Sequence, residues 1–172
     1  RSGKQSIGAA AIETSGHLTA INGPIFEGAG ESFETDGVSH PVVFSTDSGL
    51  TGGDSDLIML YAGEKNSKFA IGLATSSDGL TWTSAGKALG AGSGDWNGNS
   101  VIPNSVVATA DGGWRLWYSG FDGSRWRIGS ATSSNGRDWN RESGPRGYQF
   151  GLGEPGSWDD SGVKDAWVIE DD

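Results

Sequence analysis

Short apolar stretches alternate with polar and glycine-rich turns along the whole chain, and no stretch of useful length has the period of an amphipathic helix. In the clearest part of the chain, strands are expected at about 101–108, 114–119 and 126–132, followed by a short one around Trp139. Valine, isoleucine, tyrosine and tryptophan recur in these stretches, as they do in half-buried strands. The pattern therefore predicts an all-β chain.

Two turns in this pattern carry a hairpin signature. Asn135-Gly136 precedes the last strand of the group, and Asp78-Gly79 holds the same place in an earlier, similar stretch. Both central residues of a type I′ turn need a positive φ, which these residue types tolerate. The two pairs therefore predict tight β-hairpins.

The pattern also repeats. Residues 71–82 read Ile-Gly-Leu-Ala-Thr-Ser-Ser-Asp-Gly-Leu-Thr-Trp, and residues 128–139 read Ile-Gly-Ser-Ala-Thr-Ser-Ser-Asn-Gly-Arg-Asp-Trp. A third, less similar copy starts earlier in the chain, at Ile7. Self-similarity of this kind is typical of solenoids, propellers and arrays. Four antiparallel strands in each repeat indicate one blade of a β-propeller.

A further block aligns without gaps in three copies, Phe33–Phe44, Trp96–Val107 and Trp158–Ile169, and contains the first strand of each blade. The order of strands predicts two complete four-stranded antiparallel blades flanked by partial blades. The repeat units run over 6–69, 70–126 and 127–172. Uncovered edge strands favour association, so we expect further sequence, a companion fragment or a second copy of the chain to complete a ring. An open array that stands alone is the alternative.

Composition and charge exclude some partners. The formal net charge of -10 argues against nucleic acid and against an anionic membrane surface, because both need clustered lysine and arginine. The longest apolar stretches span only a few residues, so no membrane span is expected. The chain has no cysteine, which excludes disulfides and thiolate metal sites.

Two motifs resemble a known superfamily. Ile-Gly-x-Ala-Thr-Ser-x-Asp-Gly-x-x-Trp follows a strand that ends in Trp-Tyr-Ser-Gly, and Gly-x-Trp-Asp-x-x-Gly-Val-x-Asp-x-x-Val-Ile comes later. Together they resemble the five-bladed β-propeller glycosidases, which include arabinanases and β-xylosidases, invertases and levanases, and the related mannoside phosphorylases. The resemblance implies a five-bladed ring, of which this chain supplies only a part, and a carbohydrate ligand. It also favours an extracellular or periplasmic location, although the residues themselves indicate no compartment.

In that superfamily, carboxylates at the starts of the innermost strands line a central funnel. Glycoside hydrolysis needs two such groups, one protonated to assist the leaving oxygen and one ionised to activate water or attack directly. The equivalent column here holds His40, Pro103 and Asp165, and only Asp165 keeps the acid. The resemblance makes Asp165 the candidate catalytic carboxylate. His40 is a candidate partner, because histidine is the residue type that can serve as an acid or a base near neutral pH. Structural, hydrogen-bonded roles are the alternative for both residues.

Five further side chains are candidates for binding a sugar: Trp167, Asn104, Glu34, Asp36 and Asp160. Trp167 breaks its column, where the other copies have valine and serine, so its ring is the one best suited to stack on a ligand. The acids lie in loops that lead into the innermost strands, where solvated loop acids are the alternative. The repeating aromatic column at the start of each block is expected to pack against neighbouring strands instead.

No cofactor and no metal are expected. The oxygen-rich loop with Asp47, Asp54 and Asp56 tempts a calcium assignment, but its spacing does not match an EF-hand, and a solvated loop is favoured. Two functions then remain. The first is a glycoside hydrolase-like propeller that binds or hydrolyses a glycan at the funnel. The second is a glycan-binding or self-assembling module that has lost the catalytic acids, favoured by the replacements at His40 and Pro103.

Overall fold

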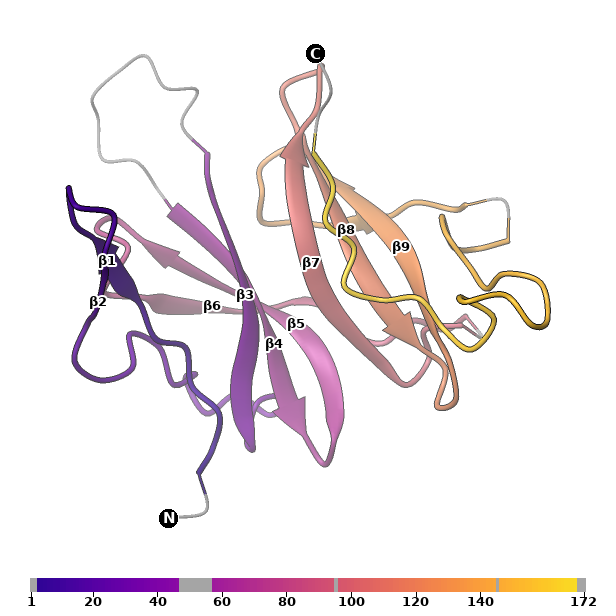
Figure 1. Ribbon diagram of the computed structural model, residues 1–172, viewed down its shortest axis with the longest axis horizontal. Coiled ribbons are helices and arrows are strands. Elements are labelled where there is room, and N and C mark those ends of the chain that lie inside the picture. Colours follow the sequence, from indigo (N-terminus) through magenta and orange to yellow (C-terminus); the bar gives the residue numbers. More distant parts are fainter. Residues whose placement is uncertain (1–2, 47–56, 95, 145, 170–172) are drawn as a thin grey trace.

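The computed structural model describes residues 3–46, 57–94, 96–144 and 146–169. This described part consists of strands and loops, and it holds no helix that could cross a membrane. Two four-stranded antiparallel sheets face one another, and a two-stranded hairpin lies beside the first of them (Figure 1). The all-β prediction and the prediction of propeller-type blades are confirmed.

Each sheet is one blade, built from strands that pair in chain order. The first blade contains β3 (Gly37–Ser45), β4 (Leu57–Lys65), β5 (Lys68–Ser76) and β6 (Thr83–Leu89). The second contains β7 (Ser100–Ala108), β8 (Trp114–Phe121), β9 (Trp126–Ser133) and β10 (Asn140–Arg141). An N-terminal hairpin of β1 (Ala10–Ile12) and β2 (Leu18–Ala20) supplies part of a further blade.

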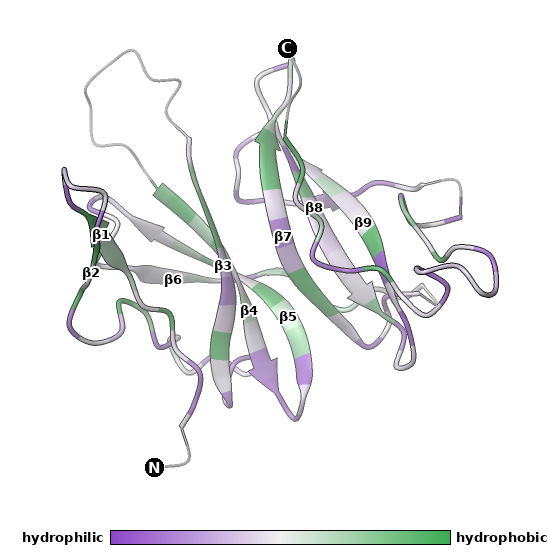
Figure 2. Ribbon diagram, viewed as in Figure 1, coloured by the Kyte–Doolittle hydropathy of each residue, from purple (hydrophilic) through white to green (hydrophobic). Residues whose placement is uncertain are grey.

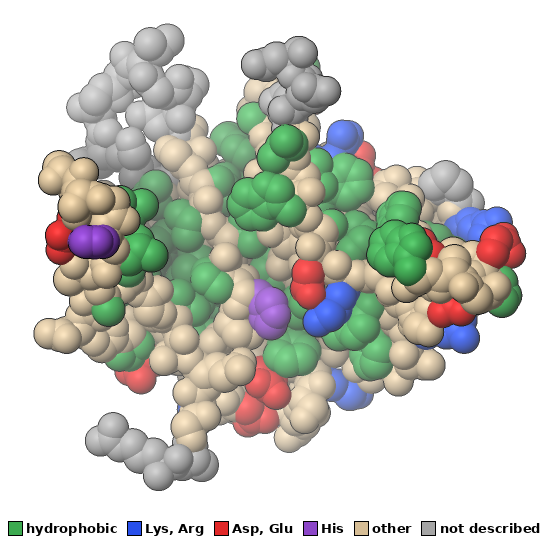
Figure 3. Space-filling view, in the orientation of Figure 1, with side chains coloured by type: hydrophobic (Ala, Val, Ile, Leu, Met, Phe, Trp, Pro, Cys, Tyr) green, Lys and Arg blue, Asp and Glu red, His purple; other side chains and the backbone are tan. Residues whose placement is uncertain are grey.

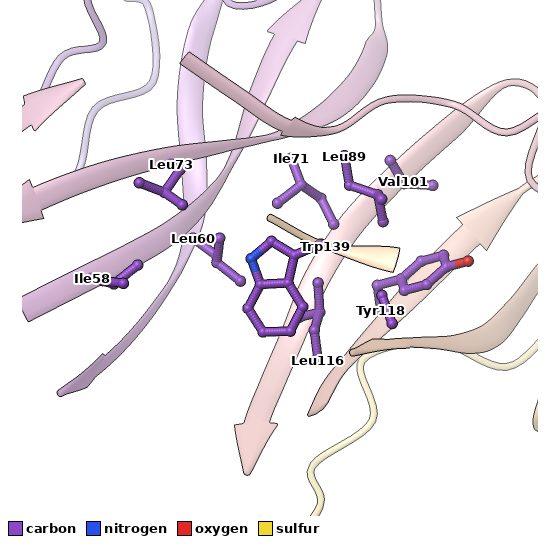
Figure 4. Close-up of a cluster of buried hydrophobic side chains, with 10 residues drawn as sticks. Ile58, Leu60, Ile71, Leu73, Leu89, Val101, Leu116, Tyr118 and Trp139 are labelled. Atoms are coloured by element: carbon purple, nitrogen blue, oxygen red, sulfur yellow. The ribbon is translucent and has the colours of Figure 1, made fainter. Parts of the chain in front are cut away.

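Of the two buried hydrophobic clusters among the described residues, one lies between the two blades, and the other packs the N-terminal residues Ile7 and Phe26 against the first blade. Side chains from β4 and β5 meet side chains from β7 and β8, with the Trp139 indole between them (Figure 4). The cluster comprises Ile58, Leu60, Ile71, Leu73, Leu89, Val101, Leu116, Tyr118, Ala131 and Trp139. Hydrophobic residues recur along the strands of both blades (Figure 2). Because burying one such side chain stabilises the fold by roughly 1.5–3 kcal/mol, this interface fixes how the blades stand relative to one another.

The hairpins expected at Asp78-Gly79 and Asn135-Gly136 are present, but they are not type I′ turns. Positive φ occurs only at the glycines, 73° at Gly79 and 70° at Gly136. The Asp78 carboxylate instead accepts hydrogen bonds from the N–H groups of Leu80 and Thr81, at 2.8 and 2.7 Å, and these bonds hold the pKa of Asp78 well below its usual range. The side-chain bonds therefore build a wider loop than the pair alone predicts.

The last predicted strand differs from the prediction. Residues 163–169 run beside the second blade but are not a strand in the described part of the chain (Figure 1). Isolated hydrogen bonds hold them: the Val163 N–H donates to the Trp126 carbonyl at 3.1 Å, and the Val168 N–H donates to Ser105 Oγ at 3.2 Å. A strand needs a continuous ladder of backbone hydrogen bonds. Among the described residues, the single backbone bond from Val163 to Trp126 does not form such a ladder.

The aromatic column packs on the second strand of each complete blade. Phe33 stacks on Tyr61 with ring centroids 6.4 Å apart, and Trp96 stacks on Tyr118 at 5.7 Å. A Cβ atom on Gly120 would collide with the Trp96 ring, so a glycine is needed where the ring lies on the strand. The third member, Trp158, is 88% exposed.

Candidate functional site

Three stretches of chain converge on one open pocket of about 370 Å³. They are the middle of β3, the middle of β7 and the segment 163–169, which hold equivalent places in the three copies of the repeat. The lining residues are His40, Pro41, Val42, Pro103, Asn104, Asp165, Ala166 and Trp167. The face shown in Figure 3 includes a histidine next to an acidic and a basic side chain between the blades. The structure thus brings together four of the seven predicted site residues.

The backbone at this pocket departs from regular strand geometry. The pairing of β3 with β4 shifts register between Ser39 and Val42, and that of β7 with β8 shifts between Pro103 and Ser105. Such bulges re-aim side chains and are common beside active sites. The equivalent residues His40 and Asp165 both adopt positive φ, 51° and 58°. Non-glycine residues held in this conformation cluster at functional sites.

His40 is exposed, and its ring is oriented by two neighbours. Ser39 Oγ lies 2.8 Å from its Nδ1 atom, and the Phe69 ring lies edge-on with centroids 6.4 Å apart. Because the serine occupies Nδ1, the remaining polar atom of the ring is Nε2. Depending on the tautomer of the ring, Nε2 can donate or accept a hydrogen bond.

Asp165 supplies the acid of the pocket. Its side chain is 50% exposed, and its Oδ2 atom lies 3.1 Å from Lys164 Nζ. Its backbone N–H donates to Ser119 Oγ at 3.0 Å. The lysine places a positive charge next to the carboxylate, and the serine fixes the backbone from which that carboxylate projects.

Asn104 and Trp167 add an amide and an aromatic ring to the pocket. Asn104 Nδ2 donates to the Pro103 carbonyl at 3.1 Å, and its Oδ1 accepts from Ser119 at 2.7 Å. Trp167 borders the pocket and is 81% exposed, so its ring is available for stacking. An amide beside an exposed indole offers hydrogen bonds and an apolar platform together.

The other three predicted residues lie elsewhere. Glu34 is buried, and its carboxylate accepts hydrogen bonds from the Tyr61 hydroxyl and the Ala29 N–H, both at 2.6 Å. Asp36 accepts the Asn66 N–H at 2.6 Å, and Asp160 accepts the Gly156 N–H at 2.7 Å. None of the three lines the pocket. Each holds a loop in place, and substrate binding by them stays a prediction.

Sequence reasoning missed Lys164 and Ser119. Lys164 lies beside the candidate acid in the sequence, and that adjacency was the available signal. Ser119 lies on a different strand, far along the chain from Asp165, and the Trp-Tyr-Ser-Gly motif that contains it does not indicate a contact with that residue. Only the packing of the second blade against residues 163–169 brings the serine to the pocket.

A larger groove of about 800 Å³ lies on the outer face of the second blade. Arg115, Trp117 and Val168 are among its lining residues. Ile58 and Leu60, the repeat equivalents of Arg115 and Trp117, pack against the second blade. The groove is therefore the position that a following blade would occupy, and the smaller pocket is the better candidate for chemistry.

Among the described residues, no three His, Asp or Glu side chains gather closely enough to hold a metal ion. Asp47, Asp54 and Asp56, the acids of the oxygen-rich loop, lie outside the described residues. The prediction of a solvated loop there, with calcium binding as its alternative, is accordingly not tested.

Comparisons with known proteins locate the fold. No protein-family model and no curated protein sequence matches the chain. Among solved structures, β-1,2-mannobiose phosphorylase from Listeria innocua is similar with a TM-score of 0.64 and 16% identity, over 86% of this chain and 38% of that one. A glycosidase-like protein from Bacteroides thetaiotaomicron is similar with a TM-score of 0.56 and 20% identity, over 83% of this chain and 42% of that one.

A third similar structure is a glycoside hydrolase of the mannoside phosphorylase family that targets β-1,2 mannosidic linkages in Candida mannan. It matches with a TM-score of 0.56 and 18% identity, over 91% of this chain and 44% of that one. The chain thus spans less than half the length of these proteins. The three structural similarities show that the chain shares the fold of the propeller-type glycoside hydrolases and mannoside phosphorylases.

Proposed function

We propose that this chain is the glycan-binding part of a carbohydrate-active β-propeller. The observation that carries the proposal is the meeting of His40, Asn104, Asp165 and Trp167 at one pocket. The similar structures include proteins that act on mannosides, which supports a glycan as the ligand. The pocket contains a ring platform, an amide, an acid and an imidazole, the groups that bind sugar hydroxyls and faces.

Each side chain has a distinct role in the proposed complex. The Trp167 indole stacks on the apolar face of a sugar ring. Asn104 and His40 Nε2 hydrogen-bond hydroxyl groups. The Asp165 carboxylate accepts hydrogen bonds from a sugar hydroxyl or, in a hydrolytic reaction, acts as one of the two carboxyl groups at the glycosidic bond.

Binding without turnover is the second candidate function. Asp165 is the only acid among the lining residues that the structure describes. The equivalent positions hold His40 and Pro103, and proline can neither donate nor accept a proton through its side chain. Hydrolysis would need a second acid from a blade outside this chain, or His40 in its place.

A panel of glycans separates the two functions. We would measure binding by calorimetry and turnover by the release of product. The panel contains aryl arabinosides, xylosides and fructosides, together with β-1,2-mannobiose tested with and without phosphate. Asp165→Asn is the test variant, and Asp138→Asn, an exposed acid in the β9–β10 hairpin, is the matched control. Turnover that Asp165→Asn alone abolishes supports the enzyme, and binding without turnover supports the second function. Failure of every glycan to bind contradicts both.

We also propose that a further strand covers the third copy of the repeat. In the first blade Phe33 stacks on Tyr61 while Glu34 accepts the tyrosine hydroxyl. In the second blade Trp96 stacks on Tyr118 while Asn97 Nδ2 donates to the tyrosine hydroxyl. The third copy has the same pair, Trp158 and Asp159, and Trp158 is exposed. A strand with the Tyr-x-Gly pattern, paired to residues 163–169, would complete this contact.

A further inference from the structure

Ser119 on β8 is fully buried, and it connects two of the proposed ligand-binding residues. Its Oγ atom accepts the Asp165 N–H at 3.0 Å and donates to Asn104 Oδ1 at 2.7 Å. A backbone N–H can only donate, so the serine hydroxyl accepts there. The hydroxyl donates to Asn104, because Nδ2 of that residue faces the Pro103 carbonyl, which can only accept, and this leaves Oδ1 toward the serine. The direction of both hydrogen bonds is fixed.

This arrangement also fixes the Asn104 amide. Because Oδ1 points to the serine, Nδ2 points the other way, where one of its N–H groups donates to the Pro103 carbonyl at 3.1 Å. The second N–H of Nδ2 remains for a ligand. A flipped amide would place Oδ1 against the Pro103 carbonyl, so that two acceptors would face each other.

The contact between the first and second blades lacks the hydrogen bonds that Ser119 makes. The repeat makes Ala62 the equivalent of Ser119 and Pro103 the equivalent of Asp165. Alanine has no hydroxyl, and proline has no N–H to donate. The hydroxyl acceptor and the N–H donor are thus both absent between the first and second blades. Both are present between the second blade and residues 163–169, where Asp165 lies.

We infer that Ser119 is a positioning residue for the glycan site, which orients the Asp165 backbone and the Asn104 amide through one hydroxyl. The inference rests on the proposed function, because the two residues that Ser119 orients are residues proposed there to bind the glycan. Asp165 has a positive φ of 58°, a conformation that the surroundings must hold. Loss of the hydroxyl would release the N–H of Asp165 and the amide of Asn104 together.

Amide hydrogen exchange measured by NMR tests the hydrogen bond without reference to any glycan. In Ser119→Ala, exchange at the Asp165 N–H should become about two- to tenfold faster, as expected for the loss of one net hydrogen bond. Ser105→Ala is the matched control, since Ser105 is a buried serine that accepts the Val168 N–H of the same segment. It should accelerate exchange at Val168 and leave Asp165 unchanged. Equal exchange at Asp165 in wild type and Ser119→Ala would overturn the inference.

Glycan affinity tests the positioning role. Ser119→Ala should weaken binding of the glycan found in the panel by about three- to tenfold, and Ser119→Thr, which keeps the hydroxyl, should recover most of the loss. Ser130→Ala, at a buried serine that donates to Glu142, should bind as wild type. Faster exchange at Asp165 with unchanged affinity would overturn the role and leave a purely structural bond. If the wild type binds no glycan, the proposed function and the role fail together, while the exchange data still decide whether the bond exists.

Discussion

His40 and Asp165 occupy the same place in two copies of the repeat, and both have left-handed backbone conformations. Histidine and aspartate are among the few residue types that tolerate this conformation. In the copy between them the place is held by Pro103, whose ring fixes a negative φ. The pocket is therefore built from two strained positions and one that cannot adopt the same geometry.

Substitutions at His40 should separate backbone strain from chemistry. His40→Gly should leave the free energy of unfolding unchanged or raise it slightly, since glycine adopts a positive φ without cost, whereas His40→Ala should lower it by about 1 kcal/mol. Both variants remove the imidazole, so both should weaken glycan binding to a similar extent. Urea unfolding and calorimetry check the two effects. Equal stability of the glycine and alanine variants would contradict the strained conformation.

Glu34 should matter for stability and not for ligand binding. Burial, with the adjacent Glu34 carboxylate, raises the pKa of Tyr61 and keeps its hydroxyl a donor. Glu34→Ala would leave that hydroxyl and the Ala29 N–H without their partner, lowering the free energy of unfolding by about 2–3 kcal/mol.

Glu34→Gln is the matched variant. Its effect should be below about 1 kcal/mol, because the second blade already uses an amide at this place, where Asn97 Nδ2 donates to Tyr118. Denaturant unfolding measures both changes. A loss of glycan affinity in Glu34→Gln at unchanged stability would instead support the substrate-binding role predicted from the sequence.

At the scale of the element, the β8–β9 turn depends on one ion pair. Asp122 accepts a hydrogen bond from Arg127 at 2.7 Å and the N–H groups of Ser124 and Arg125. The Arg127 guanidinium, with these N–H groups, lowers the pKa of Asp122 from 3.8 to about 2. A carboxyl whose pKa falls on folding stabilises the folded state above its unfolded pKa, and the contribution disappears as the pH falls through the folded pKa.

Asp122→Asn should therefore be less stable than wild type by about 1 kcal/mol at pH 7, a value that allows for solvent screening. The difference should shrink between pH 4 and pH 2 as the wild-type carboxylate becomes protonated. Urea unfolding of both proteins across this range measures it. A difference that stays constant down to pH 2 would show that the charge of Asp122 is unimportant.

The strands were readable from the sequence because the Val, Ile, Tyr and Trp positions and the glycine turns recur in each copy. The four pocket residues could be predicted from the alignment of the repeats. His40 and Asp165 occupy one aligned position, and Asn104 and Trp167 lie within two residues of it. The loop at Asp78 was not, since side-chain bonds to Leu80 and Thr81 override the turn type that the pair predicts. The burial of Glu34 was not predictable for a related reason: a loop acid becomes buried only when a side chain from another strand, here Tyr61, packs against it.

At the scale of the molecule, the exposed Trp158 predicts association. We expect the chain to form a particle heavier than the 17.8 kDa monomer, either with a companion fragment or with a second copy. Trp158→Ser should weaken the association, whereas Leu80→Ser, at an exposed hairpin tip, should not. Sedimentation equilibrium measures both. A wild-type mass of 17.8 kDa at all concentrations would contradict ring completion.

The pocket itself is tested most directly by an NMR titration of the isotope-labelled protein with the glycan panel. A glycan site between the three copies predicts saturable shifts at His40, Asn104, Asp165 and the Trp167 indole. Signals of the β8–β9 turn should remain in place. Shifts confined to other residues, or none with any glycan, would contradict the account.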